Sequence, residues 1–265
     1  MGPSITESLY LLGAQDSIVG VTSYCIRPPQ AREKERVGTV ISVNVEKATS
    51  LKPDLVIATS LTDPRAIEKL KSLGIKVTAF SQPENFSEVC SQFMKLAKLV
   101  GKEKEATRII NTAENRVKYI KEKVDNLPKP KVFVQVGAKP LFTMTRDSFV
   151  NDFIEFAGGV NIAKEAKAGL YSREEVLRKN PDVIIIVSMG IAGEKEKETW
   201  ARYKTLNAVK GNRIYIIDSY KLCSPTPLSF AESVEEIAHI LHPHMQAPLE
   251  IGTKHTIISL TGQGE

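Results

Sequence analysis

The sequence is poor in the residues that metal clusters and disulfide frameworks need. Its 265 residues include three cysteines, four histidines and one tryptophan. Cys25, Cys90 and Cys223 form no CxxC pair and no metal-ligand spacing, and Cys90 falls in a helical pattern where we expect a core residue. All four histidines lie near the C-terminus, so the first half of the chain offers no imidazole for a zinc or manganese site. We therefore predict no resident metal and no cofactor.

Long apolar runs and strong charge of one sign are also missing. No apolar run reaches the ~18 residues of a membrane span, and no segment resembles a signal peptide. The net charge is only +5, and the Lys and Arg residues are scattered rather than clustered, so nucleic acid is not indicated. The chain has no GxGxxG, no phosphate loop and no Ser/His/Asp set with supporting context, so we predict no catalytic residues and no enzyme.

What the sequence does contain is one long amphipathic stripe at residues 105–127. Its apolar residues recur at helical spacing, its other face is charged, and no Pro or Gly interrupts it. Pro128 and Pro130 follow, as prolines often do just past a helix. At ~1.5 Å per residue, this helix would span about the width of a domain.

A sequence repeat flanks this helix. The segment from Asn44 to Ala58 matches the segment from Ser172 to Ile186 at a constant offset of 128 residues. Each copy begins with a capping residue and a short helix carrying a Glu near its start, and continues through Pro-Asp into an apolar run. Such runs are typical of parallel strands buried on both faces. We predict an α/β fold of two lobes with mainly parallel sheets, joined by one long helix.

Most of the chain resembles the periplasmic binding proteins of ABC importers for vitamin B12, ferric siderophores and haem, whose lobes are joined by one rigid helix. The resembling segments cover nearly all of residues 3–242 and include PSITESLYLLGA, NVEKATSLKPDLVIA, FVQVGAKPLFT, FAGGVNIA and YSREEVLRKNPDVIIIV. The resemblance implies a first lobe at 1–104, a backbone helix at 105–127, a second lobe at 128–243 and a tail at 244–265.

The resemblance also implies a function. The protein would be a periplasmic or membrane-associated extracellular monomer that captures a metal chelate (a ferric siderophore, haem or a corrinoid) between its lobes and delivers it to a membrane permease. In the family, one Glu on each lobe pairs with permease arginines, and Glu46 and Glu174 stand at those positions. Charge complementarity at a helix start is the alternative explanation for both residues.

Ligands of open α/β sheets bind at loops that follow the strands. This rule selects a set of candidate ligand-binding residues that includes two arginines, which would suit an anionic ligand. The candidates are Tyr24, Arg27, Thr39, Val40, Thr59, Ser60, Phe142, Arg146, Tyr171, Ser188, Met189, Asp218, Ser219 and Tyr220. Tyr24 and Phe142 stand where vitamin B12 members place cleft aromatics, but Val40, Thr59 and Ala168 stand where those members have tryptophans.

Two alternatives to an importer subunit remain on the same fold. One is a ligand sensor or interaction module, which a neighbouring permease gene would argue against. The other is a two-lobed protein similar to metallocluster oxidoreductases, although the three cysteines lack the spacing of cluster ligands.

The two ends of the chain depart from the family pattern. Family members begin with a short strand before the Pro-Ser-Ile-Thr-Glu helix, whereas here only Met1 and Gly2 precede Pro3. The segment from Lys254 to Leu260 has the form of that missing strand. We therefore predict a circular permutation in which residues 256–260 complete the sheet of the first lobe. A disordered tail is the alternative.

Overall fold

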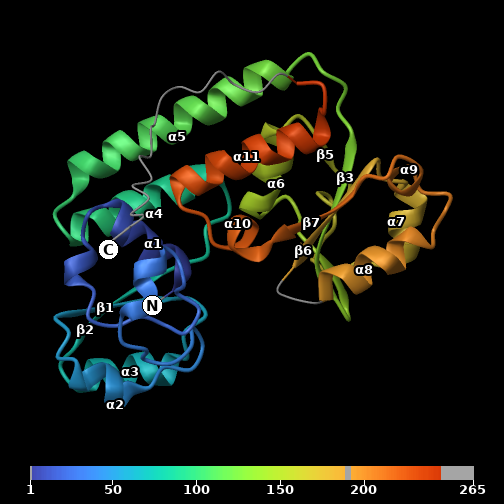
Figure 1. Ribbon diagram of the computed structural model, residues 1–265. Helices are drawn as coiled ribbons and strands as arrows, with labels where there is room; N and C mark the ends of the chain where they lie inside the picture. The colour runs from blue at the N-terminus through green and yellow to red at the C-terminus, as the bar shows by residue number, and fades with distance from the viewer. Residues whose placement is uncertain (1, 189–191, 246–265) are drawn as a thin grey trace, which may run out of the picture.

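The computed structural model describes residues 2–188 and 192–245 and consists of two α/β lobes bridged by helices (Figure 1). The first lobe comprises α1 (Pro3–Leu11), α2 (Val45–Ser50), β1 (Leu55–Thr59), α3 (Pro64–Ser72), β2 (Lys76–Phe80) and α4 (Phe86–Leu99). The second comprises β3 (Lys131–Ala138), β4 (Leu141–Thr143), α6 (Phe149–Phe156), β5 (Val160–Asn161), α7 (Arg173–Lys179), β6 (Val183–Ser188), α8 (Ala192–Ala201), α9 (Asn207–Lys210), β7 (Ile214–Asp218), α10 (Ser219–Cys223) and α11 (Pro227–Leu241). The predicted fold class is confirmed.

The long helix predicted at 105–127 is α5 (Glu103–Val124), which runs from one lobe to the other (Figure 1). Its buried residues are Ala106, Ile109, Ala113, Val117, Ile120 and Val124, which form the predicted apolar stripe. The predicted caps of the repeat are also present. The Asn44 side chain accepts a hydrogen bond from the Lys47 amide at 2.9 Å, and Ser172 accepts one from Glu175 at 3.1 Å.

The sheet of the second lobe has the strand order β4-β3-β6-β7, with β5 also paired to β3. β3 pairs in parallel with β6 from Val132 opposite Val183, and β6 pairs in parallel with β7 from Ile184 opposite Ile214. Five of the six residues of β6 are buried, as expected for a central parallel strand covered on both faces.

The sheet of the first lobe is small. In the described residues it contains only β1 and β2, paired in parallel. The segment at 18–23 forms no strand: Val21 forms an isolated bridge to Arg36, and the Cys25 amide donates to the Thr22 carbonyl oxygen and closes a turn. β1 also alternates between buried and partly exposed residues, so the expected burial on both faces holds only for β6.

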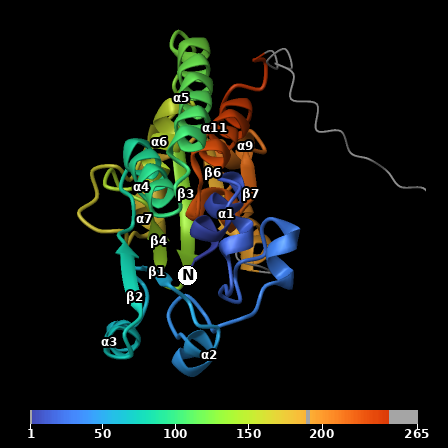
Figure 2. The same cartoon turned by 90° about the vertical axis from the view of Figure 1, so that its left-hand side faces the viewer.

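A second helix, α11, lies beside α5 and reinforces the bridge between the lobes (Figure 2). Arg116 of α5 forms ion pairs with Glu235 and Glu232 of α11. Beneath these helices the ring of Phe230 stacks on Phe86 of α4 at 4.4 Å and on Phe153 of α6 at 4.2 Å between ring centroids. This aromatic cluster joins the first lobe to the core of the second.

The helix α1 begins at Pro3, with Gly2 as its N-cap residue and no side-chain capping bond. The strand predicted at 256–260 and the candidate Met189 lie outside the described residues.

Candidate functional site

A cavity of about 710 Å³ lies between the lobes and is lined by residues of both. The first lobe contributes the start of α1, the loop at 39–41, the ends of β1 and β2, and one face of α4. The second contributes Met144, Phe149, residues of α10 and the turn that leads from α10 into α11. Volume and position suit a small-molecule ligand. We call this cavity the inter-lobe cavity.

The structure brings part of the predicted ligand-binding set to this cavity. The candidates among its lining residues are Tyr24, Thr39, Val40, Thr59, Ser219 and Tyr220. Thr59 is the last residue of β1, and Ser219 and Tyr220 begin α10 directly after β7, so these three lie at the carboxyl ends of strands. Tyr24 is 58% exposed, so most of its surface is free for a ligand.

Two further candidates, Arg27 and Asp218, lie beside the cavity and contact each other across the lobes. Arg27 Nη2 is 3.8 Å from Asp218 Oδ1, and the guanidinium lies 5.0 Å from the ring centroid of Tyr220. The Tyr220 hydroxyl donates a hydrogen bond to the Tyr24 carbonyl oxygen. These four residues form an inter-lobe clasp at one side of the cavity.

The remaining candidates are not among the lining residues. Phe142 packs its ring against Gly169, where a Cβ would lie 2.2 Å from the ring. Tyr171 stacks on Phe133 at 5.8 Å between centroids, and burial raises the pKa of its hydroxyl. Arg146 forms an ion pair with Glu165. The Ser60 amide donates a hydrogen bond to the Phe80 carbonyl oxygen just past the pairing of β1 with β2. Ser188 lies opposite Asp218 at the end of the pairing of β6 with β7.

Glu46 and Glu174 are both exposed, one in each lobe, at the starts of α2 and α7. Both helices lie away from the bridging helix α5 (Figure 1). Neither carboxylate has an ion-pair partner among the residues that the structure describes.

Sequence reasoning missed the apolar wall of the inter-lobe cavity. Val89, Phe93 and Leu96 of α4 line it, together with Ile41 and Leu61. The helical spacing of apolar residues on α4 predicts a buried face. This spacing does not distinguish a face packed in a core from a face that lines a cavity. Ile41 and Leu61 are 65% and 60% exposed, and the position of an apolar residue two places after β1 was the signal available for Leu61.

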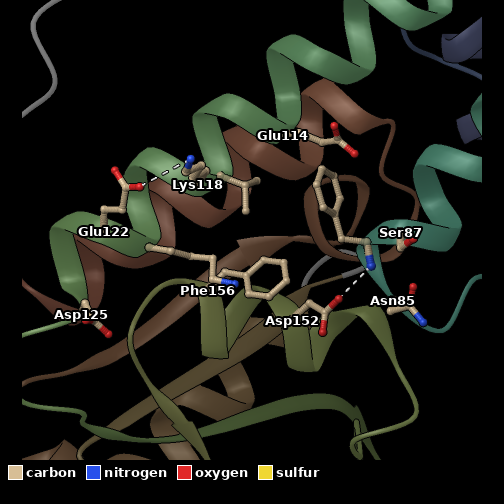
Figure 3. Close-up of a pocket in the computed structure, with 11 residues that line it drawn as sticks. Asn85, Ser87, Glu114, Lys118, Glu122, Asp125, Asp152 and Phe156 are labelled. Carbon is tan, nitrogen blue, oxygen red and sulfur yellow. Dashed lines mark hydrogen bonds and ion pairs between the residues drawn. The ribbon is translucent and has the colours of Figure 1, made fainter.

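A second cavity, of about 690 Å³, lies on the outer side of the bridge between α5, α6 and the start of α4 (Figure 3). Six of its eleven lining residues are ionisable: Glu114, Lys118, Lys121, Glu122, Asp125 and Asp152. Asp152 of the second lobe accepts a hydrogen bond from the Phe86 amide of the first at 2.8 Å, as the dashed line in Figure 3 marks. Burial raises the pKa of this carboxyl, although the amide lowers it.

The part of the chain that the structure describes contains no group of three or more His, Cys, Asp and Glu side chains placed to hold a metal ion. Cys25 and Cys90 are buried, and burial raises the pKa of Cys90 to about 12. No helix among the described residues is both long and apolar enough to cross a membrane.

Two lobes bridged by helices, with a cavity lined from both, define a two-lobed ligand-binding protein rather than a compact single-lobe domain. Comparison with known proteins identifies the family. The model of the periplasmic binding protein family matches residues 1–221, and the chain belongs to that family.

Individual relatives agree with this assignment. The chain is 33% identical over 250 residues to an uncharacterised ABC transporter substrate-binding lipoprotein, YvrC, of Bacillus subtilis, covering 91% of this chain and 78% of the relative. It is 28% identical to the solved vitamin B12-binding protein BtuF of Vibrio cholerae, with a TM-score of 0.77 and coverage of 91% and 94%. The haem-binding protein RhuT of Roseiflexus sp. RS-1 has a TM-score of 0.82 at 20% identity and coverage of 92% and 97%, and shares the fold.

Proposed function

We propose that this protein is the extracytoplasmic substrate-binding component of an ABC importer that captures a metal chelate and delivers it unchanged to a permease. The observation that carries the proposal is the inter-lobe cavity, which takes residues from both lobes. Family membership and the B12-binding relative support the chelate class, which includes corrinoids, haem and ferric siderophores. The lipoprotein relative supports a location outside the cytoplasm, in the periplasm or at the outer face of the membrane.

The absorption spectrum of the protein purified from its source tests the ligand class. Corrinoids, haem and ferric siderophores each have their own visible bands, so a co-purified chelate can be identified directly. Titration calorimetry of the stripped protein then measures the stoichiometry. A single site is expected, and failure of all three chelate classes to bind would overturn the proposal.

Glu46 and Glu174 would dock the protein to its permease, one from each lobe. Their exposure and lack of an ion-pair partner among the described residues leave both carboxylates available to arginines of a partner. The double variant Glu46→Ala with Glu174→Ala should lose transport and keep its ligand affinity. The matched control is Glu68→Ala with Glu198→Ala, which removes two other exposed carboxylates, one per lobe. Loss of ligand affinity in the first double variant would contradict a docking role.

A further inference from the structure

Among the residues that the structure describes, the wall of the inter-lobe cavity carries no ionised side chain. None of its 28 described lining residues is Asp, Glu, Lys, Arg or His. In a chain with 25% charged residues, an arbitrary set of that size would include about seven. The outer cavity of Figure 3 has a similar volume and six ionisable residues among eleven. The absence of charge is therefore a property of the inter-lobe wall and not of cavities in this protein generally.

Two groups that line the inter-lobe cavity, Tyr220 and Cys223, favour their neutral forms. Burial raises the pKa of the Tyr220 hydroxyl and of the Cys223 thiol above their ordinary values. Both groups therefore stay protonated and uncharged around neutral pH, and the Tyr220 O–H is held by the Tyr24 carbonyl oxygen.

A cation beside the cavity, Arg27, already has a carboxylate partner. Arg27 pairs with Asp218 and lies over the Tyr220 ring within the inter-lobe clasp. Glu7 of α1 is a further carboxyl near this guanidinium; burial raises its pKa and Arg27 opposes that effect. Arg146, the other arginine that could meet an anionic ligand, pairs with Glu165. Neither arginine is available to a ligand anion without breaking an existing pair.

What the wall offers instead is apolar surface with neutral hydrogen-bonding groups. Hydroxyls come from Ser219, Thr226 and other Ser and Thr residues, and amides come from Gln82 and Gln92. Two helices, α1 and α11, begin at the cavity, and the unpaired amides of a helix start suit a partial negative charge such as a ligand carbonyl oxygen. A full anionic charge would lose its hydration without gaining a cationic partner.

We propose that the inter-lobe cavity selects chelates of no net charge, with an apolar body and a periphery of amide or hydroxyl groups, and rejects polyanionic chelates. This inference rests on the proposed function and narrows its substrate class. Among the chelates considered, it favours corrinoids and neutral ferric hydroxamates over ferric catecholates and over haem with its two propionates.

Titration calorimetry with four probes tests the selection: cyanocobalamin and ferrichrome as neutral chelates, ferric enterobactin and haemin as anionic ones. At least one neutral probe should bind, and both anionic probes should bind at least about 100-fold more weakly than it, since an unpaired buried charge is costly. The dissociation constant of the neutral probe should also be unchanged between low and high salt.

A charge placed in the wall gives a second readout. Gln82→Arg adds a cation at an exposed lining position, and Gln15→Arg makes the same change outside the lining. Gln82→Arg should improve binding of ferric enterobactin or haemin at least about 10-fold relative to the neutral probe, because it supplies the missing partner. Gln15→Arg should leave the ratio of the anionic and neutral dissociation constants unchanged.

The outcomes separate this inference from the proposed function. Tight binding of an anionic chelate to the unaltered protein, with affinity that falls as salt rises, would overturn charge selection and leave chelate capture standing. Binding of none of the four probes, together with no co-purified chromophore, would overturn both. An equal gain from Gln82→Arg and Gln15→Arg would also contradict a charge-free wall as the cause of selection.

Discussion

Trp200 is the largest fully buried side chain among the described residues, and the buried polar residues Gln135 and Glu196 surround it. Its indole N–H donates to Gln135 Oε1 at 2.6 Å, and the Gln135 amide donates to Glu196 Oε2 at 2.8 Å. Arg173 completes the network with an ion pair to Glu196 at 2.5 Å and lies 4.5 Å from the indole centroid. Gln135, Glu196 and Trp200 thus have partners within one connected network, whereas Arg173 Nη1 is buried without a hydrogen-bond partner among the described residues.

This network makes part of the protein's stability depend on pH. Burial alone would raise the pKa of Glu196, but the bonds from Gln135 and Arg173 lower it below its ordinary value of 4.5. The resulting stabilisation is present above about pH 4.5 and is lost as pH falls through the lowered pKa. We expect Glu196→Gln to cost about 1–3 kcal/mol of unfolding free energy at pH 7, and the difference from the unaltered protein to shrink below pH 4.5.

Denaturant titrations across pH measure this difference, with Glu198→Gln on the same helix as control, since Glu198 is exposed. A Glu196→Gln effect that stays constant down to pH 3 would contradict the lowered pKa.

At the cavity, Tyr24 is the residue whose truncation should weaken binding most directly. Its exposed ring would become buried against the ligand, and removing such an aromatic anchor typically costs ~1–3 kcal/mol. Phe142→Ala removes a ring of similar size that is not a lining residue, so its dissociation constant should not change. Titration calorimetry measures the dissociation constants of both variants. Equal losses of affinity would show that the cavity is not the binding site.

At the scale of elements, α5 and α11 bridge the lobes together, and Phe230 is the side chain that ties them to the core. It is fully buried and stacks on rings from α4 and α6. We expect Phe230→Ala to lower the unfolding free energy by ~3–5 kcal/mol, the usual cost of a large cavity in a core. Tyr119→Ala, an exposed aromatic on α5, should change it by less than about 1 kcal/mol. Thermal unfolding of both variants checks this, and a small loss for Phe230→Ala would mean that the bridge does not depend on the cluster.

At the scale of the whole molecule, this bridge limits how far the lobes can move. The helices α5 and α11, the aromatic cluster and the Asp152 hydrogen bond to Phe86 all cross between the lobes on one side. We therefore expect apo and ligand-bound forms to differ by only a few degrees of lobe rotation. Solution scattering with and without ligand measures the change, and a large decrease in radius of gyration on binding would contradict a rigid bridge.

The inter-lobe clasp should instead set the rate of ligand exchange. Arg27→Gln with Tyr220→Phe removes the ion pair and the hydroxyl bond to Tyr24 while keeping side chains of similar size. Ligand dissociation measured by stopped flow should become faster, because one side of the cavity is no longer held closed. An unchanged dissociation rate would leave the clasp without a role in exchange.

Features that depend only on neighbours along the chain could be predicted from the sequence. Asn44 and Ser172 cap their helices because a cap needs only the next three residues, and the stripe of α5 needs only helical spacing. The repeat at an offset of 128 residues indicated two similar lobes before any contact was known. The strand predicted at 256–260 stays a prediction, and amide exchange at Ile257 and Ile258 would test it.

Only the tertiary structure decided which side chains meet. Tyr220 and Tyr24 are 196 residues apart, and no periodicity records that their loops touch. Phe142 follows the same strand-end rule as Tyr24, yet it packs on Gly169 instead of lining the cavity. The sequence pattern of α4 predicts a face packed in a core, but part of that face forms a cavity wall. The reason is that the opposite lobe does not fill the space in front of it. The charge-free character of that wall follows from the same cause, since its residues come from segments throughout both lobes.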